Sequence, residues 1–432
     1  MFRLFFKECK NISKDLVYIV YILIIIVFYI TQYGNQVHGV FNKSSLENVY
    51  SWSDYSMEEP KQLDGIDVEK YIEENDTYPY GKKNDEVPSI VESIIFNTLF
   101  DEYSKGTYSA YPFGYIQHVK LDSDCTKRVE EILEEISGKS ISNLKEIYKN
   151  EEEFRKLTGN LNFDYDRFKE LMSEVNKMVG KGSSYDPNEF YSYSYVALSY
   201  EDAVREYNDF LNIDGISSGL ARIFCDYMGI IVSLYPIFIV VLMFLKDKKN
   251  NIHEIIYSSK VTAFKLIINR YMAIVAMSIL PVIVLAIIST GTLWYRVPSN
   301  LIQYFDYFSF IKYSLEWLLP SIMIVTSIGM IVTLITDGFF AIVLQILWWI
   351  YTMFNAGVIG KYALSFIIIR FNSIEKRQVY FDNINAIFVN RMFYSILSII
   401  LVILSVVVFK MKRKGRLANH NGYKRNFKIS KN

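Results

Sequence analysis

Long runs of apolar residues divide this chain into one hydrophobic segment, a polar stretch, and a later series of hydrophobic segments. A helix needs about twenty consecutive apolar residues to cross the ~30 Å hydrocarbon core of a bilayer. Soluble proteins seldom contain several runs of this length, so the pattern predicts an α-helical polytopic membrane protein with six transmembrane helices. The predicted spans are Leu16–Tyr33, Ile223–Leu245, Leu266–Thr290, Tyr307–Thr336, Phe339–Ile359 and Phe393–Phe409.

The polar stretch, residues 34–220, keeps regular apolar faces and many aromatic residues, which disordered segments lack. It therefore reads as a large, mainly helical domain between the first and second spans. Capping residues and terminal glycines predict helices at Pro88–Tyr103, Thr126–Ile136, Ser140–Leu157, Tyr165–Val179 and after Ser199. Two segments richer in aromatic and β-branched residues, Ala110–Leu121 and Phe190–Ala197, are compatible with strands or with ordered loops.

The first fifteen residues carry a second periodic pattern. Apolar side chains recur at helical spacing, from Phe2 to Ile12, with basic residues between them. This spacing predicts a helix lying in the membrane interface, and a plain basic flank of the first span is the alternative. The pattern thus assigns 1–15 to a cytoplasmic interfacial helix, 16–33 to a span, 34–220 to an extracellular domain, 221–410 to a five-helix bundle and 411–432 to a basic tail.

The formal net charge of zero conceals a strong sorting of charge. Residues 34–220 contain 36 Asp and Glu against 19 Lys and Arg, whereas the remainder contains 10 and 27. With the N-terminus inside, 18 basic residues lie on the inner face and six in the short outer loops. By the positive-inside rule we expect a multi-pass protein of the cell membrane with both termini cytoplasmic. The Ile-, Lys-, Asn- and Tyr-rich composition suggests a bacterial, AT-rich genome.

Motifs for catalysis and for metal binding are missing from the sequence. There are three cysteines and four scattered histidines, and none has zinc-ligand spacing. There is also no P-loop and no catalytic triad spacing, so we expect neither enzymatic activity nor a cofactor bound by this chain. Nucleic acid is not an expected partner, whereas the lipid bilayer is.

The connection between the second and third spans, residues 246–265, is basic and periodic. Asp247 or Asn250 is a suitable cap for a short amphipathic helix, which suits docking onto a soluble partner. Its apolar face would hold Ile252, Ile255 and Ile256, with Lys249, His253 and Glu254 facing away. An ordinary basic loop that satisfies the positive-inside rule is the alternative.

One span, an outside domain, five more spans and this loop together resemble an ABC type-2 exporter permease. In that family the loop begins with charged residues and a Glu-x-x-x-Ser stretch, which Glu254-Ile-Ile-Tyr-Ser258 matches. The family's interfacial N-terminal helix would correspond to Phe2–Ile12. This chain departs from the family in using lysines where arginines are common, in lacking a proline near Ser259, and in having a larger insert than compact members.

The resemblance implies a permease subunit that exports a hydrophobic or amphipathic substrate, such as a peptide, lipid or drug-like molecule. A separate ATP-binding cassette subunit would bind ATP and receive the coupling helix, and a second permease copy or a sister permease would complete the pore. The implied docking residues are Lys248, Lys249, Ile252, His253, Glu254, Ile255, Ile256 and Ser258. A membrane-anchored receptor or sensor, whose domain 34–220 binds an extracellular ligand without transport, is the alternative.

Charged residues inside predicted spans are costly, and each is a candidate functional site. Arg222 and Asp226 lie four apart at the outer end of the second span, and Lys312 and Glu316 repeat that spacing in the fourth. The spacing predicts ion pairs within one helix, with a structural role favoured over substrate contact. The apolar segment Tyr362–Phe371 is too short to span and is expected to be re-entrant or interfacial.

Overall fold

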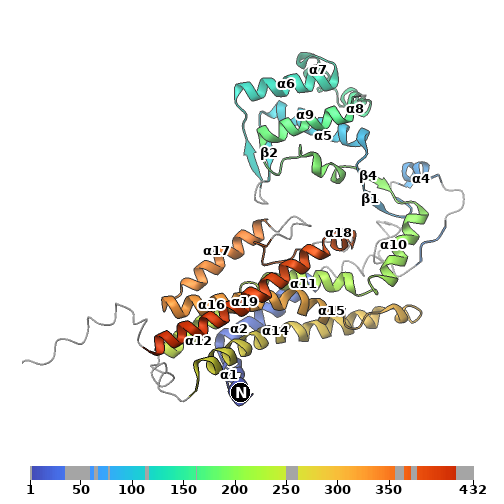
Figure 1. The fold of residues 1–432 in the computed structure, drawn as a ribbon. Coiled ribbons are helices and arrows are strands. Elements are labelled where there is room, and N and C mark those ends of the chain that lie inside the picture. The colour runs from blue at the N-terminus through green and yellow to red at the C-terminus, as the bar shows by residue number, and fades with distance from the viewer. Residues whose placement is uncertain are drawn as a thin grey trace, which may run out of the picture. The chain divides into compact units, whose positions relative to one another are not determined.

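The computed structural model describes residues 2–34, 59–62, 67–75, 78–111, 116–161, 163–249, 261–355, 364–370 and 377–414. The chain divides into two compact units (Figure 1). One unit comprises Met1–Leu46 and Asn208–Asn432, and the other comprises Glu47–Tyr207. We call them the membrane unit and the inserted unit.

The membrane unit is a bundle of apolar helices. Five helical segments are long and apolar enough to cross a membrane: Leu16–Gly34, Ser218–Lys249, Ala263–Arg296, Ile302–Thr336 and Ile384–Arg413. They confirm five of the predicted spans and make this a multi-pass helical membrane protein. The sixth predicted span, Phe339–Ile359, corresponds to α17 (Phe340–Asn355). Its 16 described residues extend about 24 Å, which is shorter than the hydrocarbon core of a bilayer.

Several of these segments are built from more than one helix. The elements are α1 (Phe2–Ser13), α2 (Leu16–Phe28) with a π-helical turn at Tyr29–Gly34, α11 (Ser218–Val232), α12 (Pro236–Lys249), α14 (Ala263–Arg296), α15 (Ser309–Tyr313), a π-helical turn at Ser314–Leu318, α16 (Leu319–Thr336), α18 (Arg377–Asp382) and α19 (Ile384–Arg413). Proline begins α12, and a short 3₁₀ turn at Ile302–Tyr304 precedes α15. The expected helix at Phe2–Ile12 is therefore present as α1.

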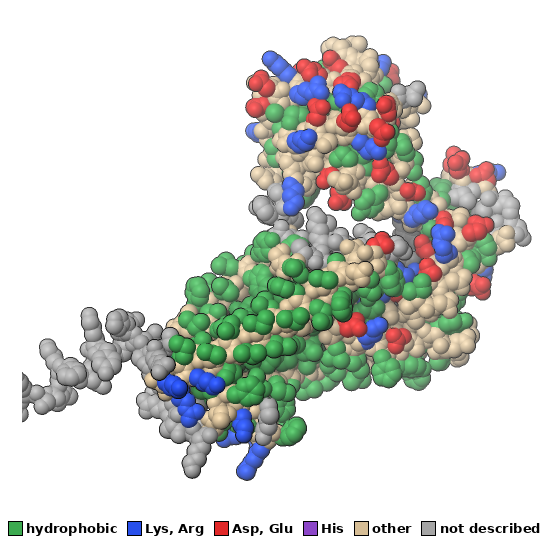
Figure 2. Space-filling model, in the orientation of Figure 1, with side chains coloured by type: hydrophobic (Ala, Val, Ile, Leu, Met, Phe, Trp, Pro, Cys, Tyr) green, Lys and Arg blue, Asp and Glu red, His purple; other side chains and the backbone are tan. Residues whose placement is uncertain are grey.

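The core of the membrane unit lies between α12, α16, α17 and α19. It includes Ile237 and Val241 of α12, Val325 of α16, and Tyr394 of α19. The helices α12 and α16 approach closely at Gly329, where an added Cβ would lie 2.7 Å from the Cδ1 atom of Ile237. Figure 2 shows hydrophobic side chains covering the flank of this bundle, with Lys and Arg gathered at the end where α12 and α19 finish.

The inserted unit has a core of its own, made from helices predicted by the sequence. They are α5 (Pro88–Lys105), α6 (Ser123–Ser137), α7 (Ile141–Ile147), α8 (Glu151–Gly159) and α9 (Tyr165–Val179). The helix α4 (Val68–Asn75) precedes them, and α10 (Tyr200–Asn212) follows them and crosses the boundary between the two units at Tyr207. The buried core residues all lie between Val91 and Phe190. This part of the chain therefore encloses a hydrophobic core without residues from the membrane unit.

One predicted helix of the inserted unit, Ser140–Leu157, is wrong as a continuous element. It is two helices, α7 and α8, because Asn150 caps α8 by accepting a hydrogen bond from the Glu153 amide. The two segments left open between strand and loop contain short strands. β1 (Lys82–Asn84) pairs antiparallel with β4 (Tyr195–Ala197), and β2 (Tyr108–Ala110) pairs antiparallel with β3 (Gln117–Val119).

Candidate functional site

The predicted coupling loop is described only at its two ends. Lys248 and Lys249 form the last turn of α12. The other predicted docking residues, Ile252, His253, Glu254, Ile255, Ile256 and Ser258, lie outside the described residues. The described residues continue from Val261, and the Thr262 side chain caps α14 by accepting a hydrogen bond from the Lys265 amide. The candidate site is therefore built from the contacts that hold these two ends.

The first contact joins the end of α12 to the start of α2. Lys246 Nζ lies 3.1 Å from Asp15 Oδ2. Asp15 also caps α2, because its side chain accepts a hydrogen bond from the Val17 amide. The same carboxylate therefore fixes the start of the first span and the end of the second.

The second contact is a buried ion-pair cluster centred on Arg270 of α14. Arg270 Nη2 lies 2.6 Å from Asp247 Oδ2, and its Nε lies 3.3 Å from Glu8 Oε1. The guanidinium also lies over the Phe244 ring, 5.3 Å from the centroid. Arg270 is only 5% exposed and Glu8 6%, so both charges depend on each other for compensation. This cluster links α1, α12 and α14.

The third contact surrounds Asp337, in the short connection between α16 and α17. Asp337 adopts a left-handed conformation (φ 54°) that ends α16. Its carboxylate lies 2.6 Å from Lys412 Nζ of α19 and 3.8 Å from Lys248 Nζ of α12. At the far end of the loop, Arg413 Nη1 donates to the Val261 carbonyl oxygen at 2.8 Å. We refer to these three groups of contacts as the basic-end network.

The basic-end network attaches both ends of segment 250–260 to the rest of the membrane unit. On one side, residues 246–248 contact Asp15 at the start of α2, Arg270 of α14 and Asp337 of the α16–α17 connection, and Arg270 in turn contacts Glu8 of α1. On the other side, Val261 contacts Arg413 of α19. Exposed pairs of this type are individually worth about 0–1 kcal/mol, whereas the buried Arg270 cluster costs more to break. A force applied to the loop would therefore reach several helices at once.

The charges predicted inside the second span are buried, but their ion pairs differ from the predicted ones. Arg222 Nη1 lies 3.0 Å from Asp214 Oδ1, and Asp226 Oδ1 lies 2.5 Å from Arg370 Nε. The second oxygen of Asp214 lies 2.7 Å from Arg377 Nε. The predicted pairing of Arg222 with Asp226 within one helix is therefore corrected, because each residue meets a partner from another segment.

The position of Asp214 depends on a tight turn just before α11. Gly215 and Ile216 both have positive φ values, 52° and 63°. This conformation is unfavourable for a β-branched residue such as Ile216. The turn is held by Ser217, whose hydroxyl donates to the Asp306 carbonyl oxygen at 2.7 Å. The Asp214 carboxylate is thereby held where it meets two arginines.

Aromatic rings surround the same buried guanidinium. The Arg222 guanidinium lies 4.6 Å from the Tyr380 ring centroid, and its Nη1 donates to the Tyr313 hydroxyl at 3.3 Å.

The other predicted pair is not formed in the described part of the chain. Lys312 and Glu316 are both exposed, and Lys312 Nζ lies 5.6 Å from the Tyr313 ring centroid. The π-helical turn at Ser314–Leu318 changes the rotation that the four-residue spacing assumes.

A segment without helical structure, residues 364–370, packs against α16, α17 and α19 through its buried residues 366–369. Its apolar residues Ile367 and Ile368 join the core of the membrane unit. Arg391 of α19 holds the segment, because Nη2 donates to the Ile367 carbonyl oxygen at 3.1 Å while Nη1 donates to the Trp317 carbonyl oxygen at 2.8 Å. Further donors to its carbonyls are Trp348 to Ser365, Asn390 to Phe366, Ser321 to Ile367 and Tyr394 to Leu364.

Sequence reasoning missed Glu8, Asp214, Arg270 and Arg391. Glu8 and Arg270 each interrupt an apolar face, and that interruption was the available signal. The charge pattern of the sequence assigned Arg391 only to the six basic residues of the short outer loops. Its position at the start of an apolar helix is typical of an intramembrane polar contact.

Among the described ranges no group of three His, Cys, Asp or Glu side chains is placed to hold a metal ion. In comparisons with known proteins, no protein-family model, no curated protein and no solved structure matches this chain.

Proposed function

We propose that this protein is the membrane-spanning permease subunit of an ATP-binding-cassette transporter, powered by a separate ATP-binding subunit. The order of elements supports the proposal: an amphipathic α1, an apolar helix, an inserted unit and a series of further apolar helices. The observation that carries it is the basic-end network, because it ties both ends of the predicted coupling loop to the helices that such a loop must move.

In this proposal the ATP-binding subunit receives segment 250–260 and displaces it when ATP binds. The displacement passes through Asp247 to Arg270 and α14, and through Lys248 and Asp337 to α16 and α19. Ion pairs suit this task because they keep the helix ends together without requiring a rigid continuous backbone. The free energy of ATP binding would then drive the rearrangement of these helices.

The full topology belongs to the same proposal. α17 would complete a sixth span, the termini would be cytoplasmic, and the inserted unit Glu47–Tyr207 would lie outside the cell membrane. Two permease copies, or this chain and a sister permease, would form the transport pathway. The substrate would be hydrophobic or amphipathic, such as a peptide, lipid or drug-like molecule, and it would move outward, as the resemblance to exporter permeases implies.

Co-purification from native membranes tests the proposal. Charge reversal at Lys249 together with truncation of Ile255 and Ile256 to alanine should abolish recovery of a P-loop protein with the tagged chain, measured by mass spectrometry. A matched control is Lys312→Glu, which reverses an exposed lysine away from this loop and should leave recovery unchanged. Equal recovery of the P-loop protein with the triple variant would contradict docking at this loop.

A further inference from the structure

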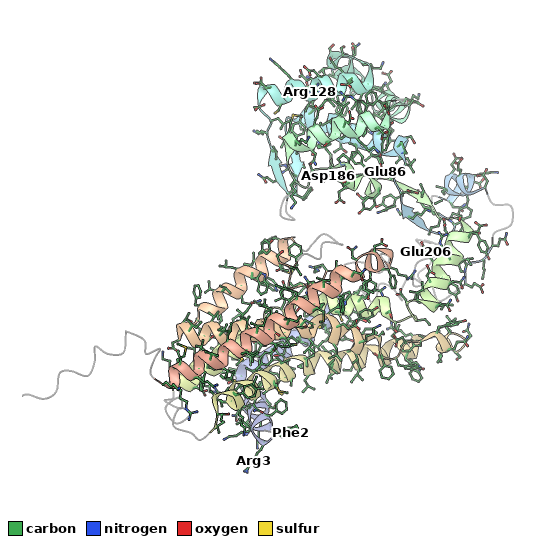
Figure 3. The ribbon with its side chains drawn as sticks, in the orientation of Figure 1. Phe2, Arg3, Glu86, Arg128, Asp186 and Glu206 are labelled. Atoms are coloured by element: carbon green, nitrogen blue, oxygen red, sulfur yellow. The ribbon has the colours of Figure 1, made fainter. Side chains whose placement is uncertain are left out.

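A pocket of about 500 Å³ lies between α1 and the ends of α2, α12 and α14. In Figure 3, Phe2 and Arg3 mark the start of α1, which lies beside the end of the bundle. A volume of this size is typical of sites that hold a small organic ligand or part of a lipid. The pocket lies within the membrane unit, and its walls come from the described residues.

The pocket has an apolar part and a charged rim. The apolar walls come from all four helices and include Ile12, Val17, Ile239, Met243 and Leu266. The rim carries Lys7, Lys14, Lys246 and Arg270 together with Glu8, Asp15 and Asp247. This combination matches an amphipathic ligand with a charged head and an apolar tail.

The carboxylates of the rim all take part in ion pairs, but two of them share one arginine, which leaves one negative charge in excess. Glu8 and Asp247 pair with Arg270, and Asp15 pairs with Lys246. Lys7 and Lys14 are exposed, and no ion pair to either is recorded in the part of the chain that the structure describes. Lys7 lies in α1, and Lys14 lies in the turn that directly follows this helix. Four cations against three carboxylates give the rim a net charge of +1, which these two lysines supply and which favours an anion.

The position of the pocket matches the boundary between apolar and polar surface. The long apolar run of the first span begins at Leu16, directly after the rim residues Lys14 and Asp15. On α1, Phe2 is 81% exposed and Phe6 is 64% exposed, as expected for a helix that lies at the lipid interface. Basic pockets between helices at this depth are suited to anionic lipid headgroups.

We infer that this pocket binds an anionic phospholipid, whose phosphate meets Lys7 and Lys14 and whose acyl chain lies against Ile239 and Met243. The inference does not depend on the proposed transport function, because it rests on the charge and shape of the pocket alone. The bound lipid would touch α1, α12 and α14 together, next to the Arg270 cluster.

Lipid binding to the purified full chain tests this inference. In detergent, phosphatidylglycerol should bind at least tenfold more tightly than phosphatidylcholine, as measured by native mass spectrometry. Lys7→Gln combined with Lys14→Gln should reduce phosphatidylglycerol affinity at least tenfold. Lys10→Gln removes an exposed lysine of the same helix that does not line the pocket, and it should change the affinity less than twofold.

A second variant tests the acyl part of the site. Met243→Trp fills the apolar wall, and it should weaken binding of phosphatidylglycerol while the lysines stay in place. Inorganic phosphate at millimolar concentration should compete only weakly, because it lacks the tail. Full competition by phosphate, or unchanged phosphatidylglycerol binding in both the double lysine variant and Met243→Trp, would overturn the inference.

Discussion

Arg391 shows how a single buried charge is held by neutral acceptors, with no acidic partner among the residues that the structure describes. Its guanidinium donates to the carbonyl oxygens of Trp317 and Ile367, to the hydroxyl of Ser321 and to the amide oxygen of Asn390. These acceptors are neutral dipoles that surround the planar guanidinium group from several sides. Arginine suits such a position because it presents five donors in a fixed geometry. The residue therefore joins α16, α19 and the segment 364–370.

We expect Arg391→Met to lower the free energy of unfolding by about 3 kcal/mol, because at least three oxygens lose a charged donor at roughly 1 kcal/mol each. Thermal unfolding of the detergent-purified chain measures this loss. Lys312→Met, which removes an exposed cation, serves as the control and should change stability by about 0.5 kcal/mol or less. Equal stability of Arg391→Met and the parent would show that other contacts position the segment.

Glu92 of α5 gives a prediction about pH. Its side chain is 3% exposed, and burial raises the pKa of its carboxyl group above the usual range. A raised pKa in the folded state means that this group favours folding below the unfolded pKa of about 4.3. That contribution is lost as the pH rises through the folded pKa. Ionisation of this buried carboxyl group at higher pH therefore lowers the stability of the inserted unit.

Glu92→Gln should accordingly raise the melting temperature of the inserted unit at pH 7, and the gain should vanish near pH 4. Circular dichroism of residues 47–207 at a series of pH values measures the difference. Glu151→Gln, at an exposed position of α8, provides a matched control with little expected change. A gain that is the same at pH 4 and pH 7 would mean that ionisation of Glu92 is not its cause.

The buried ion pairs of the second span could be predicted only in part from the sequence. A rule based on four-residue spacing identified Arg222 and Asp226 as costly charges, and both are buried. It could not identify their partners, because Asp214 lies in a turn before the helix and Arg370 lies in a distant segment. Spacing within one helix predicts only contacts along that helix.

At the scale of elements, α1 combines two faces with different partners. The predicted apolar face is partly exposed through Phe2 and Phe6, while Ile12 is buried. Glu8 points to Arg270 of α14 and makes a buried ion pair. The periodicity of the first residues predicted the helix, and Glu8 stood out only as a charge that interrupts an apolar face, which did not identify Arg270 as its partner.

Loss of this attachment should be visible at Cys9, the next residue of α1. Cys9 is partly buried, and burial raises the pKa of its thiol, which slows alkylation because the thiolate is the reactive form. Glu8→Gln should free α1 from Arg270 and increase the rate of maleimide labelling several-fold at pH 7. The measurement uses a Cys125→Ser background, since Cys225 is buried.

Lys10→Gln is the control for that experiment, because it changes the charge of α1 at an exposed position without touching Arg270. Its labelling rate should stay close to that of the parent. If Glu8→Gln labels no faster than Lys10→Gln, the Glu8–Arg270 pair does not determine how α1 is held.

Elements differ in how far the sequence predicts them. Apolar runs identified five spans because the length of a run is fixed by the bilayer. The division of one predicted helix into α7 and α8 was missed because the cap at Asn150 interrupts a pattern that continues on both sides. For residues 362–371 the sequence predicted only a re-entrant or interfacial segment. The path of residues 364–370 could not be predicted, because it depends on hydrogen-bond donors from three helices.

At the scale of the whole molecule, charge sorting corresponds to a division between two units. The acidic stretch 34–220 contains the inserted unit, and its hydrophobic core uses residues from Val91 to Phe190 only. A unit of this size can enclose a sufficient core by itself. Composition and periodicity predicted this division, whereas the functional partner of each unit depends on surfaces that no local pattern describes.

Residues 47–207 expressed alone should therefore form a soluble helical protein with a cooperative thermal transition, measured by circular dichroism. Phe96→Ala empties a buried core position and should cost about 3–5 kcal/mol. Tyr191→Ala changes an aromatic residue that is 43% exposed and should cost much less. A non-cooperative transition in the unsubstituted segment would show that the inserted unit needs the membrane unit in order to fold.

The way in which residues 364–370 are held has a consequence for how this protein can diverge. Donors from α16, α17 and α19 contact the carbonyl oxygens of Leu364, Ser365, Phe366 and Ile367. Every amino acid supplies a carbonyl oxygen, so natural variants can exchange the apolar side chains of this segment while keeping its path. The donors have no such freedom. Related sequences should therefore drift within the segment and retain the arginine that corresponds to Arg391.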